Sequence, residues 1–145
     1  MDELTEIQIK EMIAQTLTDE MAPDCSVETE LKNLFTEPEG KIVVMYNSSS
    51  YQDSDKTSFL NRMQRGRFTI MLTVRDPLQA DLALKHKAKI RELVQGLRIG
   101  PADSDRLYPE NDRFEEFTEG SEVWAYKIDF SFSRVARISE TNAEL

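Results

Sequence analysis

The chain has a single histidine and a single cysteine, and nucleophilic or zinc chemistry would have to use them. His86 falls on the apolar stripe of a predicted helix, where a half-buried structural role or a contact with another subunit is the usual explanation. A catalytic Ser-His-Asp or Cys-His arrangement would depend on this one imidazole. The residues around Cys25 and around the serines do not form a nucleophile elbow. Zinc requires several closely spaced Cys or His ligands, so we predict no zinc site.

Carboxylates are abundant, with 27 Asp and Glu residues in the chain. The stretch DSDRLYPENDRFEE, residues 103–116, lacks the central glycine and the terminal glutamate of a calcium-binding loop. Many carboxylate pairs are possible, but no spacing selects one of them for hydrolysis. The 5 glycines are scattered and form no phosphate-binding loop. We therefore predict that the protein is not an enzyme and has no catalytic residues, cofactor or metal; an enzyme of unrecognised type is the remaining alternative.

Charge and length limit the classes of protein that fit this sequence. There are 18 basic and 27 acidic residues, giving a formal net charge of −9. This excess disfavours general nucleic-acid binding, which depends on Lys and Arg meeting phosphates, and agrees with a simple role in solubility. A length of 145 residues suits one domain, and one cysteine cannot form an internal disulfide. The acidic start MDELTEIQIK and the short apolar runs predict a soluble, intracellular protein without a membrane span.

Two amphipathic helices are predicted. Residues 4–21 place apolar side chains at spacings of three and four. In the second helix, Asp76 suits the N-cap, Pro77 suits the first turn, and Gln79 stands where a capping box would have it. Either Gly96 or Gly100 can end this helix. Its predicted apolar stripe comprises Leu82, His86, Ile90, Leu93 and Leu97.

Alternation of apolar and polar residues marks the strands. Residues 67–75, RFTIMLTVR, and residues 121–137, SEVWAYKIDFSFSRVAR, carry large apolar side chains at every second position. Residues 41–46, KIVVMY, are a shorter β-type run, and a further short strand is expected near Val27. The apolar face of the last strand should pack under the helices. That face comprises Trp124, Tyr126, Ile128, Phe130 and Phe132.

Two long polar segments separate these elements. Residues 47–58 are interpreted as a loop or a long hairpin arm, mobile in the free subunit, and residues 98–118 as an acidic loop with room for a short strand. The order of the elements predicts an α+β fold, a mostly antiparallel sheet with two main helices packed on one face. We expect one domain over residues 1–138 and a flexible tail over residues 139–145.

The best candidate for a binding surface is a cluster of basic side chains at the start of a strand. Arg62, Arg65 and Arg67 stand near Tyr51 and form either an ordinary solvated strand entrance or a contact for an acidic surface. Because the chain itself is acidic, that surface would belong to another copy or to a partner protein. The acidic candidates for this pairing are Asp103, Asp105, Glu115, Glu116 and Glu119.

The order of these elements and the residue patterns of the strands resemble those of the tail-terminator proteins of long-tailed phages, in particular the Mu-like contractile phages. The resemblance lies in the amphipathic helix EIQIKEMIAQTL and in the strand KIVVMYNSSS, which runs into a polar arm. It continues in RGRFTIMLTVRDP, which leads into a helix, and in the terminal strand SEVWAYKIDFSFS after an acidic loop.

This resemblance implies a ring, usually of six copies, at the head-proximal end of a phage tail. Such a ring stops growth of the tail tube, contacts the last sheath ring of a contractile tail, and joins the tail to the neck and head connector. DNA would pass through the lumen without specific binding. The protein would be a virion component at the tail–neck junction, assembled in the host cytoplasm. A small intracellular adaptor domain that binds a protein through its long loops is the alternative.

Overall fold

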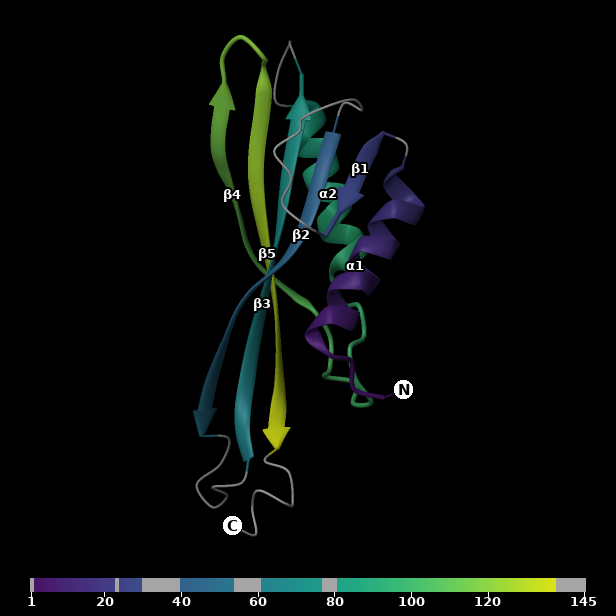
Figure 1. Cartoon of the computed structure of the whole chain (residues 1–145), viewed down its shortest axis with the longest axis vertical. Coiled ribbons are helices and arrows are strands. Elements are labelled where there is room, and N and C mark those ends of the chain that lie inside the picture. Colours follow the sequence, from purple (N-terminus) through teal and green to yellow (C-terminus); the bar gives the residue numbers. More distant parts are fainter. Residues whose placement is uncertain (1, 23, 30–39, 54–60, 77–80, 138–145) are drawn as a thin grey trace.

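The computed structural model describes residues 2–22, 24–29, 40–53, 61–76 and 81–137 (Figure 1). The elements are α1 Glu6–Met21, β1 Cys25–Glu28, β2 Gly40–Asp53, β3 Asn61–Arg75, α2 Asp81–Val94, β4 Tyr108–Thr118 and β5 Val123–Arg137. The strands form one 5-stranded sheet in the order β1-β2-β3-β5-β4, and β1 pairs with β2 in parallel while the other pairs are antiparallel. This confirms the predicted α+β class and the short strand near Val27. The predicted tail over residues 139–145 lies outside the described residues.

Helix α1 begins with a capping box. The Thr5 hydroxyl accepts from the Gln8 backbone N–H at 3.2 Å, and the Gln8 side-chain oxygen accepts from the Thr5 N–H at 2.9 Å. These bonds satisfy N–H groups that have no partner inside the helix. The predicted apolar face is confirmed, since one side of α1 is fully covered. Its buried residues are Ile9, Ile13, Leu17 and Met21.

The start of helix α2 is described from Asp81 onward, so Pro77 and Gln79 lie outside the described residues. Asp76 nevertheless contacts the helix start, because its carboxylate Oδ2 accepts from the Leu82 N–H at 3.3 Å. The carboxylate thus satisfies a donor of the first turn and adds negative charge at the positive end of the helix dipole.

The end of helix α2 is decided by Gly96, which has a φ of +83°. Glycine adopts this left-handed conformation without strain, so Gly96 and not Gly100 follows the helix. The predicted stripe is confirmed only in part, because the buried residues of α2 are Ala83, Ile90 and Val94. Ile90 is buried, and Leu82, His86, Leu93 and Leu97 are half-buried.

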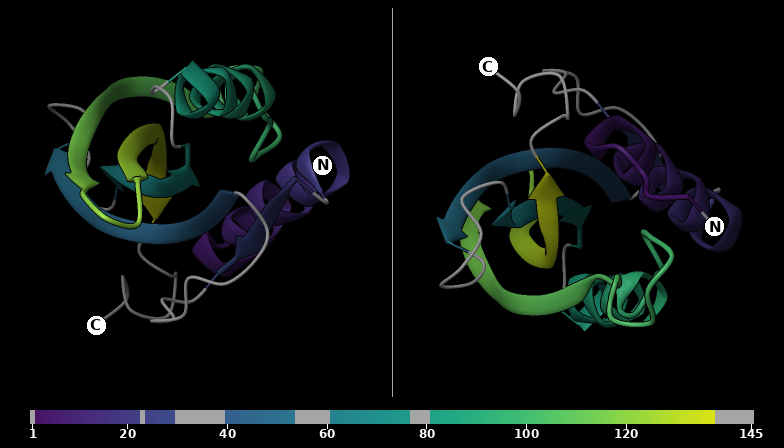
Figure 2. Two further views of the ribbon diagram at one scale, coloured as in Figure 1. Left: turned by 90° about the horizontal axis from the view of Figure 1, so that it is seen from above. Right: turned by 90° about the horizontal axis from the view of Figure 1, so that it is seen from below.

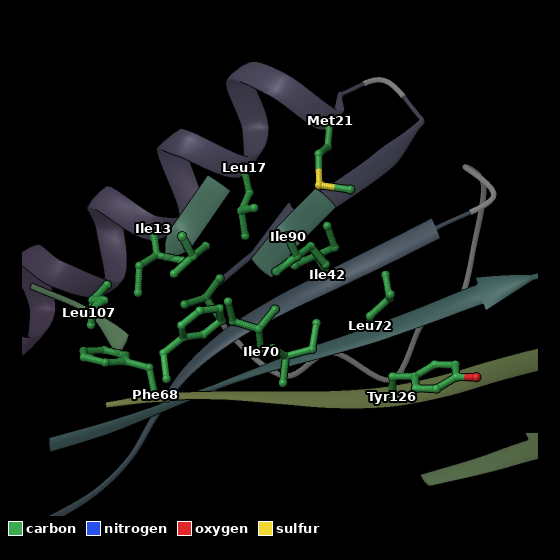
Figure 3. Close-up of a cluster of buried hydrophobic side chains, with 14 of the residues drawn as sticks. Ile13, Leu17, Met21, Ile42, Phe68, Ile70, Leu72, Ile90, Leu107 and Tyr126 are labelled. Atoms are coloured by element: carbon green, nitrogen blue, oxygen red, sulfur yellow. The ribbon is translucent and has the colours of Figure 1, made fainter. Parts of the chain in front are cut away.

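The core lies between the two helices and one face of the sheet (Figure 3). Figure 3 shows side chains of α1, among them Leu17 and Met21, directed toward those of the strands. Strand β5 supplies the face predicted from its alternation. Tyr126, Ile128, Phe130 and Phe132 are buried, and Trp124 is half-buried against the same cluster.

The polar stretch 47–58 is a strand over its described part and not a loop. β2 continues to Asp53, and Ser48 to Asp53 pair antiparallel with Arg67 to Arg62 of β3. Backbone pairing satisfies the N–H and C=O groups whatever the side chains are, so a polar run can be a strand where it faces solvent. Residues 54–58 lie outside the described residues. Of the two structures predicted for this stretch, a loop or a long hairpin arm, the described residues form the arm.

The predicted acidic loop 98–118 also needs correction, because its second half is strand β4, Tyr108–Thr118. β4 pairs with β5 and is an edge strand with most residues exposed, so its composition is charged. Two register shifts, between Pro109 and Asn111 and between Phe114 and Glu116, break the alternation that would have marked it in the sequence.

The sheet extends beyond the helices at one end. There β2 from Ser48, β3 up to Arg67 and β5 from Phe132 continue as three paired strands, which we call the arm (Figure 1). The β4–β5 hairpin, residues 108–130, lies toward the other end of the molecule. Seen along the long axis, β2 and β4 curve around β3 and β5, and both helices lie to one side (Figure 2). The molecule is therefore long, with two chemically different ends.

Gln64 and Arg134 tie the arm to helix α1. The Gln64 amide donates to Glu6 Oε1 at 2.8 Å, and Arg134 donates to Gln64 Oε1 at 3.0 Å and to the Leu4 carbonyl at 2.5 Å. The hydrogen bond from Gln64 lowers the pKa of Glu6 below its ordinary value. Protonation of Glu6 at low pH should therefore weaken the link between α1 and the arm.

Candidate functional site

Two of the predicted arginines, Arg65 and Arg67, lie on the sheet face away from the helices, which we call the outer face. Arg65 and Arg67 both contact one carboxylate of β4. Arg65 Nη2 pairs with Glu110 Oε1, and Arg67 Nε donates to Glu110 Oε2 at 2.7 Å. Charge-assisted bonds of this kind are short and directional. Because two cations share one anion, this cluster keeps a net positive charge.

A second polar cluster crosses four strands of the outer face. The Asn47 amide of β2 donates to Thr69 Oγ1 at 2.7 Å, and the Thr69 hydroxyl donates to Asp129 Oδ1 at 2.7 Å. From β4, Arg113 Nη1 donates to Asp129 Oδ2 at 2.7 Å. Asp129 is only 3% exposed. Its carboxylate raises the pKa of Arg113 through this hydrogen bond. The cluster fixes the hairpin to the centre of the sheet.

Replacing Asp129 by asparagine should lower the free energy of unfolding by about 1.5–3 kcal/mol, the range for a hydrogen bond to a charged group. An amide has one acceptor oxygen, so it cannot accept from Thr69 and from Arg113 in the present geometry. Urea unfolding measures the change. Glu119→Gln removes an exposed carboxylate of the same hairpin and should change stability by less than about 0.5 kcal/mol. Equal effects of the two variants would contradict the assigned role of Asp129.

The turn of the hairpin carries further acidic side chains. Gly120 has a φ of +90° and Glu122 a φ of 57°, so the chain reverses tightly between β4 and β5. Glu115 accepts from Arg113 at 2.9 Å and lies 3.8 Å from the Lys127 ammonium. Glu116 and Glu119 are exposed. The hairpin therefore presents carboxylates to solvent at its end.

The helix side of the same hairpin is aromatic, and we call it the aromatic patch. Phe114 is 51% and Phe117 is 38% exposed. Their rings contact Trp124, with centroids 6.0 Å and 4.4 Å away, and Phe114 also contacts Tyr126 at 5.6 Å. Such contacts hold the rings in place although water reaches them.

The remaining predicted residues are spread over the molecule. Tyr51 is exposed on the arm. Arg62 pairs through its backbone with Asp53 and Ala136, and its side chain lies outside the described residues. In the segment before β4, Asp103 lies 3.7 Å from Arg98, and Asp105 accepts from a backbone N–H.

Within one chain, the described side chains of Arg65 and Arg67 pair with none of the predicted acids. Arg65 and Arg67 pair with Glu110, which the sequence had not singled out, and Glu115 pairs with Arg113. Glu110 was missed because its position depends on β4 being a strand, and Asp129 because its contacts with Thr69 and Arg113 depend on the strand register. The bulges around Glu110 and Glu115 hide that strand in the sequence. Pairing between subunits stays a prediction.

Metal-binding and membrane-spanning features are absent from the described part of the chain. No three or more His, Cys, Asp or Glu side chains there are grouped so that they could hold a metal ion. None of the described helices has the length and the apolar composition to cross a membrane.

A family model described as Gp37 protein matches residues 13–144. The chain belongs to the Gp37 protein family. The chain also shares its fold with a chain of a solved structure, the virion of a native gene transfer agent (GTA) particle. The TM-score is 0.56 at 14% identity, and the match covers 86% of this chain and 92% of the other. At this identity the likeness concerns the fold. Among curated proteins no match is found.

Proposed function

We propose that this protein is a structural component of a phage-like virion, and specifically the tail terminator. The observation that carries the proposal is the fold shared over 86% of the chain with a protein of a gene transfer agent virion. The membership in the Gp37 family and the resemblance of its elements to tail terminators support it. In this role the protein caps the tail tube, stops its growth and joins the tail to the head connector.

The proposed assembly is a ring of this chain, expected to hold six copies, at the tail–neck junction of the virion. Its partners would be the tail tube, the sheath of a contractile tail and the neck or connector proteins, with assembly in the host cytoplasm. DNA would pass through the lumen without specific binding, and a net charge of −9 favours that passage. The different charges of the arm and of the hairpin support a contact between unlike surfaces, which is what a ring requires.

The role in tail assembly is tested by deleting the gene from its phage-like element and imaging the particles. Tails assembled without the protein should be irregular and too long, because an uncapped tube keeps growing. Supplying the wild-type protein should restore a uniform length, and negative-stain images should show it at one end of the tube. A protein that never binds the tube and does not affect its length would contradict the proposal.

Arg65→Glu should weaken ring formation and leave the subunit folded, if the arginines also contact acids of a neighbouring subunit. The reversed charge would repel those carboxylates. High salt should weaken the wild-type ring in the same way, since screening acts within about 10 Å at 0.1 M. Light scattering measures the assembly state, and circular dichroism checks the fold.

Glu110→Gln is the matched control for Arg65→Glu. It removes the negative charge that Arg65 and Arg67 share within the chain but keeps both cations. Rings should therefore form with this variant. If both variants impair assembly equally, the contact with Glu110 inside the chain explains the effect, and pairing of the arginines across subunits is wrong.

A further inference from the structure

The aromatic patch on the hairpin is built as a binding surface. Phe114 and Phe117 expose large apolar area, yet ring contacts with Trp124 and Tyr126 hold them in place. On the α2 side the patch is bounded by Lys87, whose ammonium lies 5.4 Å from the Tyr126 ring centroid and 2.8 Å from Asp112. Exposed aromatic groups that are already ordered lose little side-chain entropy when a partner covers them.

The partner is expected to approach the face of the hairpin and not its edge. β4 is the last strand of the sheet, but its two bulges distort the row of backbone groups along that edge. Bulges of this kind protect edge strands from pairing with another strand. The side chains of Phe114 and Phe117 are therefore the available contact.

The charges of the molecule indicate what the partner is. The hairpin, residues 108–130, contains seven acidic and two basic residues. The three arm segments, 48–53, 61–67 and 132–137, contain five arginines and one aspartate. Arg134 is directed to α1, but Arg65 and Arg67 are exposed enough to reach a second molecule. Opposite charges of this kind attract two surfaces and fix their register.

The hairpin meets the arm of its own subunit through Glu110, at the start of β4, but the aromatic patch lies farther along the hairpin, toward the opposite end of the sheet (Figure 1). The aromatic patch and the arm can meet between two copies arranged head to tail. The arm also has an exposed apolar side chain on each of its faces: Val135, 41% exposed, lies on the outer face with Arg65, and Tyr51, 56% exposed, lies on the face of Gln64. Each end thus combines apolar contact area with charge of one sign.

We propose that the aromatic patch of the hairpin binds the arm of a second copy of this chain. The proposal deepens the proposed function, because repetition of this unlike-surface contact closes a ring when the rotation between copies allows it. The rings of Phe114 and Phe117 are the centre of the contact, and the hairpin carboxylates and arm arginines form its rim.

The test uses two variants of the full chain that each remove one surface. The hairpin variant carries Phe114→Ser and Phe117→Ser, and the arm variant carries Tyr51→Ser and Val135→Ser. Each alone should associate at least about 10-fold more weakly than the wild type, the usual loss when central contact residues are removed. Mixed together, they should form a one-to-one dimer and nothing larger, because the pair retains one intact arm and one intact hairpin. Analytical ultracentrifugation measures these states.

Two further variants test whether a loss of self-association is specific to the aromatic patch. Tyr108→Ser removes an exposed aromatic of the same strand outside the patch, and it should not change self-association. Should the serine variants fail the check of folding by circular dichroism, Glu116→Lys with Glu119→Lys changes only exposed side chains of the hairpin. This charge variant should also weaken self-association.

Three results would overturn the inference. The hairpin variant could associate like the wild type, the mixed variants could stay monomeric, or the wild type could fail to associate even at about 1 mM. A hairpin variant that self-associates normally but no longer limits tail length would assign the patch to another virion protein. The proposed function is judged separately, since it fails only if the wild-type protein neither binds tail tubes nor limits their length.

Discussion

Phe130→Ala should lower the free energy of unfolding by about 3–5 kcal/mol, the range for removing a buried phenylalanine ring. Phe130 has no exposed surface and stands opposite Phe68 of β3, in the centre of the sheet. Interiors are close-packed, so the lost ring leaves a cavity that neighbouring side chains fill only in part. Urea unfolding followed by circular dichroism measures the change.

The control for this prediction is Ser133→Ala, on the same strand but exposed to solvent. It should change stability by less than about 0.5 kcal/mol. A loss below about 1 kcal/mol for Phe130→Ala, the average of point mutants, would mean that this face of β5 is not the core.

Gly66→Ala should lower the free energy of unfolding by about 3 kcal/mol, the upper end of the cost of overpacking. An added Cβ would lie 2.2 Å and 2.3 Å from two ring carbons of Phe132, its cross-strand neighbour. The ring cannot easily move away, because it is buried between Phe68 and the guanidinium of Arg134, which lies 4.8 Å from its centroid. Glycine at position 66 is therefore required by the close approach of the ring.

A double-mutant cycle tests the cause of this effect. In a background of Phe132→Ala, the methyl group of Gly66→Ala would enter space that the ring has left, so its cost should fall below about 1 kcal/mol. An equal cost in both backgrounds would show that the clash with Phe132 is not the reason. Gly66 lies where the arm leaves the core. A shift of the backbone there would displace the arm, so Gly66→Ala should also weaken the proposed ring.

The sequence by itself determined the helices, the core strands and the absence of a familiar catalytic motif. Burial imposes a period of two on a strand and of about 3.6 on a helix, so the alternation in β5 and the stripe of α1 could be read directly. Helix ends depend on equally local signals: Asp76, predicted as the N-cap of the second helix, accepts from its first turn, whereas the capping box at Thr5 was found only in the structure. The resemblance to phage tail proteins rested on these elements, and the chain shares its fold with a protein of a gene transfer agent virion.

Only the tertiary structure decided how the polar segments are used. β4 and the second half of β2 are strands because their backbones pair with neighbours distant in sequence, and pairing leaves no pattern in side chains that face solvent. The contact of Arg67 with Glu110 joins residues 43 positions apart, and that of Thr69 with Asp129 joins residues 60 apart. Such partners depend on strand register, which a local pattern does not contain. For this reason the arginines were found from the sequence, whereas their partners within the chain were not.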